Sequence, residues 1–225
     1  DHCLVGEPTS PSQMGEMMKI GRRGSMNAKI TATGIQGHSA YPDRSNNPIV
    51  AMVKLLDKLV SHQLDAGTEH FDPSTLAITS VDTGNKASNV IPAVTKATIN
   101  IRFNDSHSGS SLVSWLKDEI EKVSAEYGIN FKTDFKISGE SFITPPGELS
   151  DLISKAVKQE LGVTPKLSTT GGTSDARFIK DMCPVTEFGL VGKTMHAVDE
   201  KVETKQINQL KEIYTRILEA YFEKT

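Results

Sequence analysis

The residues of this chain best suited to chemistry lie in loops that follow predicted strands. Glu7 comes directly after a short apolar strand, and a carboxylate at the carboxyl end of a strand is well placed for a ligand or catalytic role. His196 precedes the last predicted helix, and imidazole is a common zinc ligand. His38 lies in a loop held by a glycine and a proline, where it could bind an anion or an oxyanion, and the Asn89 amide could orient a ligand. Taken singly, each of these residues also suits an ordinary exposed loop or turn.

A second set of residues is suited to holding an anion. The turn at 170–177, Thr-Gly-Gly-Thr-Ser-Asp-Ala-Arg, precedes a helix predicted from about Ser174. Its backbone N–H groups could hold an anion, and the helix dipole would add to this. Arg22, Arg23 and Arg102 suit bidentate recognition of a carboxylate, although each also suits a solvated surface charge.

Composition and missing motifs narrow the function classes. The 225 residues carry a net charge of −3, which argues against a nucleic-acid-binding domain, and no run of 18 apolar residues predicts a membrane span. The two cysteines, Cys3 and Cys183, are typical of a reduced cytoplasmic protein, with one disulfide not excluded. HExxH, paired CxxC and GxSxG motifs are absent. Spacing alone therefore leaves an α/β hydrolase-like enzyme or a ligand-binding protein, with metal dependence open.

Alternating and helical hydrophobic patterns over 24–138 predict one self-contained unit. Strands and helices follow one another in the order β-α-β-β-α-β, the split βαβ or ferredoxin-like pattern. The predicted strands cover 25–34, 75–83, 94–103 and 130–137, and the helices cover 46–62, with Ser45 or Asn46 as its cap, and 112–127.

The flanking segments, 1–23 and 139–225, predict a partial α/β domain into which that unit is inserted. Strands near 3–6, 165–169 and 185–189 alternate there with helices near 147–161 and 203–223, which is typical of an α/β layer. The chain begins inside an apolar strand without a methionine, which predicts a fragment of a longer protein.

Taken in order, several segments resemble the di-zinc amidohydrolases and exopeptidases, a family that includes aminoacylases, carboxypeptidases and desuccinylases. The resemblance covers essentially the whole chain, and two segments, GRRGS at 21–25 and GGTSDAR at 171–177, are most similar to the desuccinylases. The other matching segments are VGEPT at 5–9, GHSAYP at 37–42, SNVIP at 88–92, Arg102, Ser138-Gly139 and Met195-His196.

This resemblance implies a reaction and a cofactor. N-succinyl-LL-2,6-diaminopimelate would be hydrolysed to succinate and LL-diaminopimelate, a step toward lysine and diaminopimelate. Two zinc ions per active site, which cobalt can replace, would polarise the amide carbonyl and supply hydroxide. Glu7 would bind one zinc ion and His196 the other.

The resemblance also assigns roles to the inserted unit and to the substrate-binding residues. The unit would be the lid and dimerisation domain of a homodimer, and His38 would reach across the dimer interface to the oxyanion in the partner's site. Residues that would hold the substrate are Tyr41, Asn89, Arg102 and Ser138, while Arg22 or Arg23, Gly172 and Thr173 would face its carboxylates.

The chain departs from the family pattern in ways that affect activity. The other zinc ligands and the general base of the family lie upstream of the Gly-Glu-Pro segment, so we expect the fragment alone to be inactive. Gly192 stands where many desuccinylases carry an asparagine that touches substrate. Two alternatives stay open: an acetylornithine deacetylase or dipeptidase of the same family, and a non-catalytic dimerisation or ligand-binding module.

Overall fold

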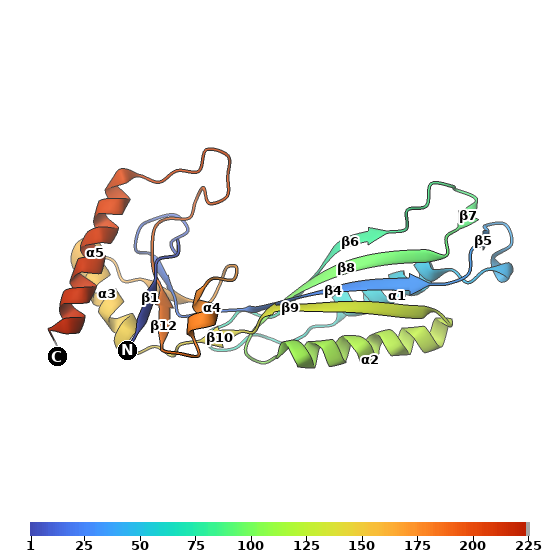
Figure 1. Ribbon diagram of the computed structural model, residues 1–225, viewed down its shortest axis with the longest axis horizontal. Helices are drawn as coiled ribbons and strands as arrows, with labels where there is room; N and C mark the ends of the chain where they lie inside the picture. Colours follow the sequence, from blue (N-terminus) through green and yellow to red (C-terminus); the bar gives the residue numbers. More distant parts are fainter. Residues whose placement is uncertain (224–225) are drawn as a thin grey trace. The chain divides into compact units, whose positions relative to one another are not determined.

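The computed structural model describes residues 1–223, and the chain divides into two compact units (Figure 1). Unit 1 consists of residues 1–23 and the described residues from 142 onward, and unit 2 consists of residues 24–141. The sequence places the second boundary after residue 138, but strand β9 continues to Gly139. Among the described residues, no helix is both long and apolar enough to cross a membrane.

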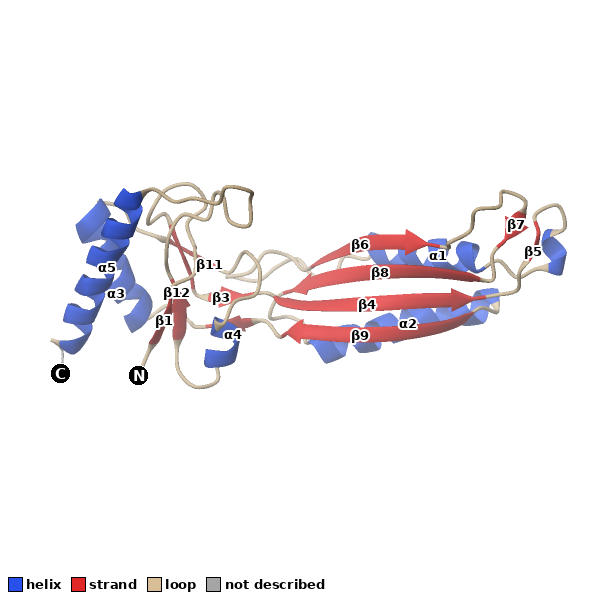
Figure 2. Cartoon of the chain, turned by 45° about the horizontal axis from the view of Figure 1, so that its top comes forward, coloured by secondary structure: helices blue, strands red, loops and turns tan. Residues whose placement is uncertain are grey.

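Unit 2 is a four-stranded antiparallel sheet with two helices against one of its faces (Figure 2). The strand order is β6-β8-β4-β9. This arrangement confirms the predicted ferredoxin-like fold. Its elements are β4 (Gly24–Thr33), α1 (Pro48–Ser61), β6 (Thr75–Asp82), β8 (Val94–Phe103), α2 (Gly109–Tyr127) and β9 (Asn130–Gly139).

The alternation of residues along β4 explains how this unit is held together. Met26, Ala28 and Ile30 are at most 1% exposed and pack against the apolar faces of both helices, because every second side chain of a strand points to the same face. Asn47, rather than the predicted Ser45 or Asn46, caps α1 by accepting a hydrogen bond from the Ile49 N–H at 3.0 Å. That cap begins the helix at Pro48, where the missing N–H costs nothing.

Three short elements lie beyond the Thr33 end of β4, at the end of the sheet opposite to Gly24. Strand β5 (Gly37–His38) pairs with β7 (Val90–Ile91), and the 3₁₀ helix η1 (Pro42–Arg44) follows β5. Both chain connections to unit 1, by contrast, lie at the Gly24 end, where β4 begins and β9 ends. The β5–β7 loops therefore form the tip of unit 2.

Unit 1 contains a mixed four-stranded sheet in the order β1-β12-β2-β11, with α3 and α5 against one face (Figures 1 and 2). The β1–β12 and β2–β11 pairs are parallel, and the β12–β2 pair is antiparallel. Its elements are β1 (Cys3–Val5), β2 (Met17–Lys19), β3 (Gly21–Arg22), β10 (Phe142–Ile143), α3 (Glu148–Leu161), β11 (Lys166–Ser168), α4 (Ala176–Ile179), β12 (Val185–Glu187) and α5 (Thr204–Phe222).

Strand β2 places apolar and charged side chains on opposite faces of this sheet. Met18 is fully buried against α3 and α5, so Lys19 points to the other face. Lys19 stands directly opposite Glu187 of β12 and beside Ser168 of β11. In this row of polar side chains, absent from the sequence-based prediction, Lys19 lines the cavity described below, and Glu187 lies beneath it.

The helix predicted from about Ser174 is much shorter than expected. It is α4, a single turn of four residues that starts at Ala176. A single turn sums few peptide dipoles, so the backbone N–H groups of the turn at residues 170–177 remain the main feature that an anion could use there.

Candidate active site

A polar cavity of about 490 Å³ in unit 1 brings together five of the residues predicted to act. They come from four different loops and strands of the unit, and Lys19 lines the cavity beside them. The five residues are Glu7, Arg22, Gly172, Thr173 and His196. Two of them are candidate metal ligands. The other three line the cavity together with the buried Lys19, whose surroundings are called the cationic end below.

The candidate ligands line the same cavity but do not complete a metal site. Glu7 follows β1, and His196 lies in the loop before α5 in a left-handed backbone conformation, with φ of 62°, which non-glycine residues seldom adopt. The His196 N–H donates to Glu200 Oε2 at 3.2 Å. Within the described part of the chain, no three His, Cys, Asp or Glu side chains gather as a metal-binding cluster. Since a structural or catalytic zinc needs at least three protein ligands, further ligands would have to come from outside this chain.

The cationic end of the cavity depends on Lys19, which the sequence analysis missed. This lysine is only 6% exposed, and its Nζ donates to Ser168 Oγ at 3.1 Å and to Thr170 Oγ1 at 2.8 Å. Burial, reinforced by the nearby Arg22 charge, lowers the pKa of Lys19 to about 8. The local pattern around Lys19 is a charged residue between two apolar ones at 18–20, which is too short to predict a strand.

Arg22 is bound by other protein groups. Its Nε lies 3.0 Å from both carboxylate oxygens of Glu187, its Nη2 also contacts Glu187, and its Nη1 donates to the Thr170 carbonyl at 3.1 Å. Arg23 is half-buried, and its Nε makes no hydrogen bond. Direct contact of either arginine with a substrate carboxylate stays a prediction.

The turn at residues 170–173 forms the exposed wall of the cationic end. Gly171 has φ of 105°, and a Cβ atom placed there would lie 2.4 Å from Arg22 Nη1, so only glycine lets the turn pass this close to the guanidinium. Gly172 has no atom within 4 Å of such a position. The backbone of this turn is therefore open toward the cavity.

Three further predicted residues lie together at the tip of unit 2. His38 pairs with Val90 in the β5–β7 ladder, and the Ser39 N–H donates to the Asn89 carbonyl at 3.0 Å. The rings of His38 and Tyr41 are 5.8 Å apart. The Ala40 N–H donates to His38 Nδ1 at 3.0 Å, so in the neutral imidazole Nε2 carries the proton and can donate.

The remaining two predicted residues lie at the other end of the same sheet. Arg102 and Gly139 both pair with Ser25 at the start of β4, and Ser138 directly precedes Gly139. Arg102 Nε donates to Asn100 Oδ1 at 3.2 Å. Since β4 spans ten residues at roughly 3.3 Å each, about 30 Å separates these residues from the His38 group.

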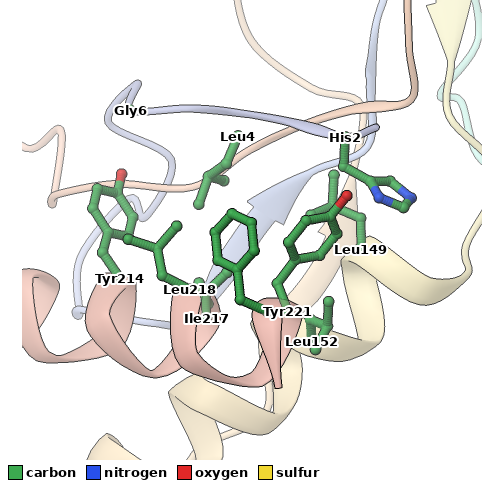
Figure 3. A pocket seen from close by; sticks show the side chains of 10 residues that line it. His2, Leu4, Gly6, Leu149, Leu152, Tyr214, Ile217, Leu218 and Tyr221 are labelled. Atoms are coloured by element: carbon green, nitrogen blue, oxygen red, sulfur yellow. The ribbon is translucent and has the colours of Figure 1, made fainter. Parts of the chain in front are cut away.

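A second cavity of unit 1 is unsuited to a charged substrate. This apolar groove, of about 380 Å³, lies between β1, α3 and α5 (Figure 3). Leu4, Leu149, Leu152, Ile217 and Leu218 line it, and the Tyr214 hydroxyl donates to the Phe188 carbonyl at 2.6 Å. Because the groove has few polar groups and none of the predicted residues, we assign the chemistry to the polar cavity.

Part of the sequence matches a known family model, and the fold is similar to that of solved structures. Residues 20–128 match the family model M20_dimer, described as the peptidase dimerisation domain. The aminopeptidase PepT from Bacillus cereus has the same fold, with a TM-score of 0.80 at 18% identity over 96% of this chain and 56% of that one. The yeast dipeptidase Dug1p gives a TM-score of 0.73 at 16% identity, over 99% of this chain and 59% of that one. The chain thus shares the fold of more than half of each of these two proteins.

Over nearly its whole length, the sequence is similar to succinyl-diaminopimelate desuccinylases. The enzyme of that name from Ruegeria pomeroyi is 65% identical over 220 residues, 98% of this chain and 58% of the relative. The one from Dinoroseobacter shibae is 62% identical over 222 residues, 99% of this chain and 59% of the relative. The chain thus spans little more than half the length of these relatives. The resemblance to desuccinylases noted from the sequence is confirmed.

Proposed function

We propose that the complete protein containing this chain hydrolyses N-succinyl-LL-2,6-diaminopimelate to succinate and LL-diaminopimelate in the cytoplasm. The observation that carries the proposal is the polar cavity, which combines two candidate metal ligands with a buried cation. The 65% identity to proteins named as desuccinylases supports this substrate.

The chemistry of the substrate matches the two ends of the cavity. A succinyl group carries a free carboxylate, which the Lys19 ammonium and the backbone of residues 170–173 can hold. The amide to be cleaved would then lie toward Glu7 and His196. Two metal ions, one bound by Glu7 and the other by His196 together with ligands from the rest of the protein, would supply a Lewis acid for the amide carbonyl. We propose zinc, two ions per active site, as that metal.

Unit 2 would assemble the protein as a homodimer and supply one catalytic group in trans. His38 lies about 30 Å along β4 from the two connections to unit 1. The His38 side chain is exposed, and its Nε2–H is a hydrogen-bond donor of the type that stabilises an oxyanion. We therefore propose that His38 acts in the active site of the partner subunit, with Tyr41 and Asn89 beside it, while Arg102 and Ser138 contact substrate from the opposite end of the sheet.

Hydrolysis by the full-length, metal-loaded protein tests this function. Released succinate would be measured with N-succinyl-LL-2,6-diaminopimelate, and N-acetylornithine and dipeptides would be offered in parallel. We expect kcat/KM to be at least about 100-fold higher for the succinylated substrate. A preference for acetylornithine or a dipeptide would overturn the substrate assignment. The 225-residue chain alone serves as the inactive control, since it supplies only two candidate ligands.

A further inference from the structure

A buried carboxylate, Glu187, lies beneath the polar cavity and does not line it. It is the last residue of β12 and is 1% exposed. Removing a carboxylate from water is unfavourable unless charged or hydrogen-bonding partners compensate. The partners that Glu187 has here indicate its role.

Glu187 holds the turn at residues 170–174 from both of its ends. At the far end, Ser174 Oγ donates directly to Glu187 Oε1. At the near end, Glu187 fixes the guanidinium of Arg22 through Nε and Nη2, and Arg22 Nη1 holds the Thr170 carbonyl. One carboxylate therefore fixes both ends of a loop whose middle, Gly171 to Thr173, lines the cavity.

The charges around Glu187 give this arrangement a second consequence. Lys19 and Arg22 both lie beside Glu187, so two cations share one anion in a buried cluster. Arg22 takes the ion pair, whereas Lys19 is hydrogen-bonded only to neutral partners, Met17, Ser168 and Thr170. The cluster thus keeps one unpaired positive charge, and that charge faces the cavity.

We propose that Glu187 is a positioning residue for substrate binding. Through Arg22 and Ser174 it holds the 170–174 turn in the conformation that receives a carboxylate, while Lys19 remains available to pair with it. This inference rests on the proposed function, because it names the succinyl carboxylate as the group received.

Glu187→Gln in the full-length protein tests the proposal. Glutamine keeps the shape of the side chain but cannot accept both hydrogen bonds from Arg22 Nε and Nη2 as a charged carboxylate does. We expect KM for the succinylated substrate and Kd for succinate, measured by titration calorimetry, to rise together by roughly 10- to 100-fold. The value of kcat should change by less than about threefold, because the carboxylate is held equally in the ground and transition states.

Two further variants separate positioning from a general loss of structure. Ser174→Ala removes only the direct contact and leaves no buried charge unpaired, so we expect a folded protein with KM and Kd raised roughly three- to tenfold. Glu160→Gln makes the same chemical change at the exposed Glu160–Arg216 ion pair, and it should change nothing.

The outcomes decide the inference. If Glu187→Gln folds and leaves KM and Kd at wild-type values, or lowers kcat alone, the positioning role is wrong. If Glu187→Gln does not fold, an unchanged Kd for succinate in Ser174→Ala refutes the positioning role. An equal rise of this Kd in Glu160→Gln would refute it as well. Succinate binding is measured without turnover, so it tests the role of Glu187 even in a protein that does not hydrolyse the substrate. Absence of hydrolysis by the wild-type protein would refute only the proposed function.

Discussion

Lys19 is a buried cation whose charge is easily lost. Its pKa of about 8 reflects burial first and then repulsion by Arg22 and Lys166, which attraction by Glu187 partly offsets. Since the ammonium is the form that attracts a carboxylate, lysine is protonated and binding is strongest below that pKa, and binding weakens as the pH rises through it.

We therefore predict a pH-dependent affinity for succinate. Between about pH 8 and pH 9.5, Kd of the full-length protein should rise by up to roughly tenfold per pH unit, because binding requires one proton on Lys19. Titration calorimetry across this range measures the effect. Lys19→Met should bind weakly at all these pH values with no such slope, whereas the exposed Lys155→Met should match the wild type. A slope that persists in Lys19→Met would assign the titration to another group.

His196 and His38 should differ in their effect on metal binding. Asparagine enters the left-handed region readily, so His196→Asn keeps the backbone at φ of 62° while removing the imidazole. We expect this variant to lose bound metal, measured by atomic emission, together with activity. His38→Ala should retain its metal and lower kcat by about 10²–10³, the usual effect of losing one oxyanion donor. Metal loss in His38→Ala, or full metal in His196→Asn, would reverse the two assignments.

Which residues could be predicted depended on the local signal around each one. Glu7 and His196 stand in short motifs, so the sequence indicated them and the fold places both in one cavity. Lys19 and Glu187 have no such motif. Their importance arises from a ladder contact between positions 168 residues apart in the chain, and a single sequence does not reveal that pairing.

Two adjacent glycines in one turn should respond differently to the same substitution. Gly171 has φ of 105°, and an added Cβ would lie 2.4 Å from Arg22 Nη1, whereas the equivalent position at Gly172 is open. We expect Gly171→Ala to lower the free energy of unfolding by about 1–3 kcal/mol and to weaken succinate binding. Gly172→Ala should change stability by less than about 1 kcal/mol. Chemical denaturation of both variants measures this, and equal effects would contradict the described conformation of the turn.

Long elements were predictable, whereas five of the very short strands were not. In unit 2, ten-residue strands and helices of 14 and 19 residues each carry several hydrophobic repeats, enough to show a period of 2 or 3.6. Strands β2, β3, β5, β7 and β10 have two or three residues. Tertiary pairing, rather than local pattern, determines that such segments are strands.

A mixed dimer tests whether the active site is shared between subunits. We expect His38→Ala homodimers and Glu7→Gln homodimers to be nearly inactive, since one lacks the oxyanion donor and the other a metal ligand. If His38 acts in trans, mixed dimers contain one site with neither defect, and activity should recover to about half of the wild-type value per mixed dimer. Native mass spectrometry verifies that mixed dimers form. Mixed dimers that remain inactive would rule out a role for His38 in the partner's site.

Unit 2 should also fold when it is produced separately. It has its own apolar core of strand and helix residues, and its first and last strands pair with each other. We expect residues 24–141 to unfold cooperatively and to form dimers, as measured by calorimetry and by sedimentation. A non-cooperative transition would show that the unit depends on the rest of the chain.

The chain enters and leaves unit 2 through neighbouring antiparallel segments, since Arg22 pairs with Phe142 and Ser25 with Gly139. A domain whose first and last residues lie side by side in this way can be replaced by another without altering the path of the surrounding chain. Replacing unit 2 with the corresponding segment of a distant relative would change which subunits recognise each other. The residues of unit 1 that form the cationic end of the cavity would stay the same. Engineers could thereby produce desuccinylase-like subunits that pair only with a chosen partner.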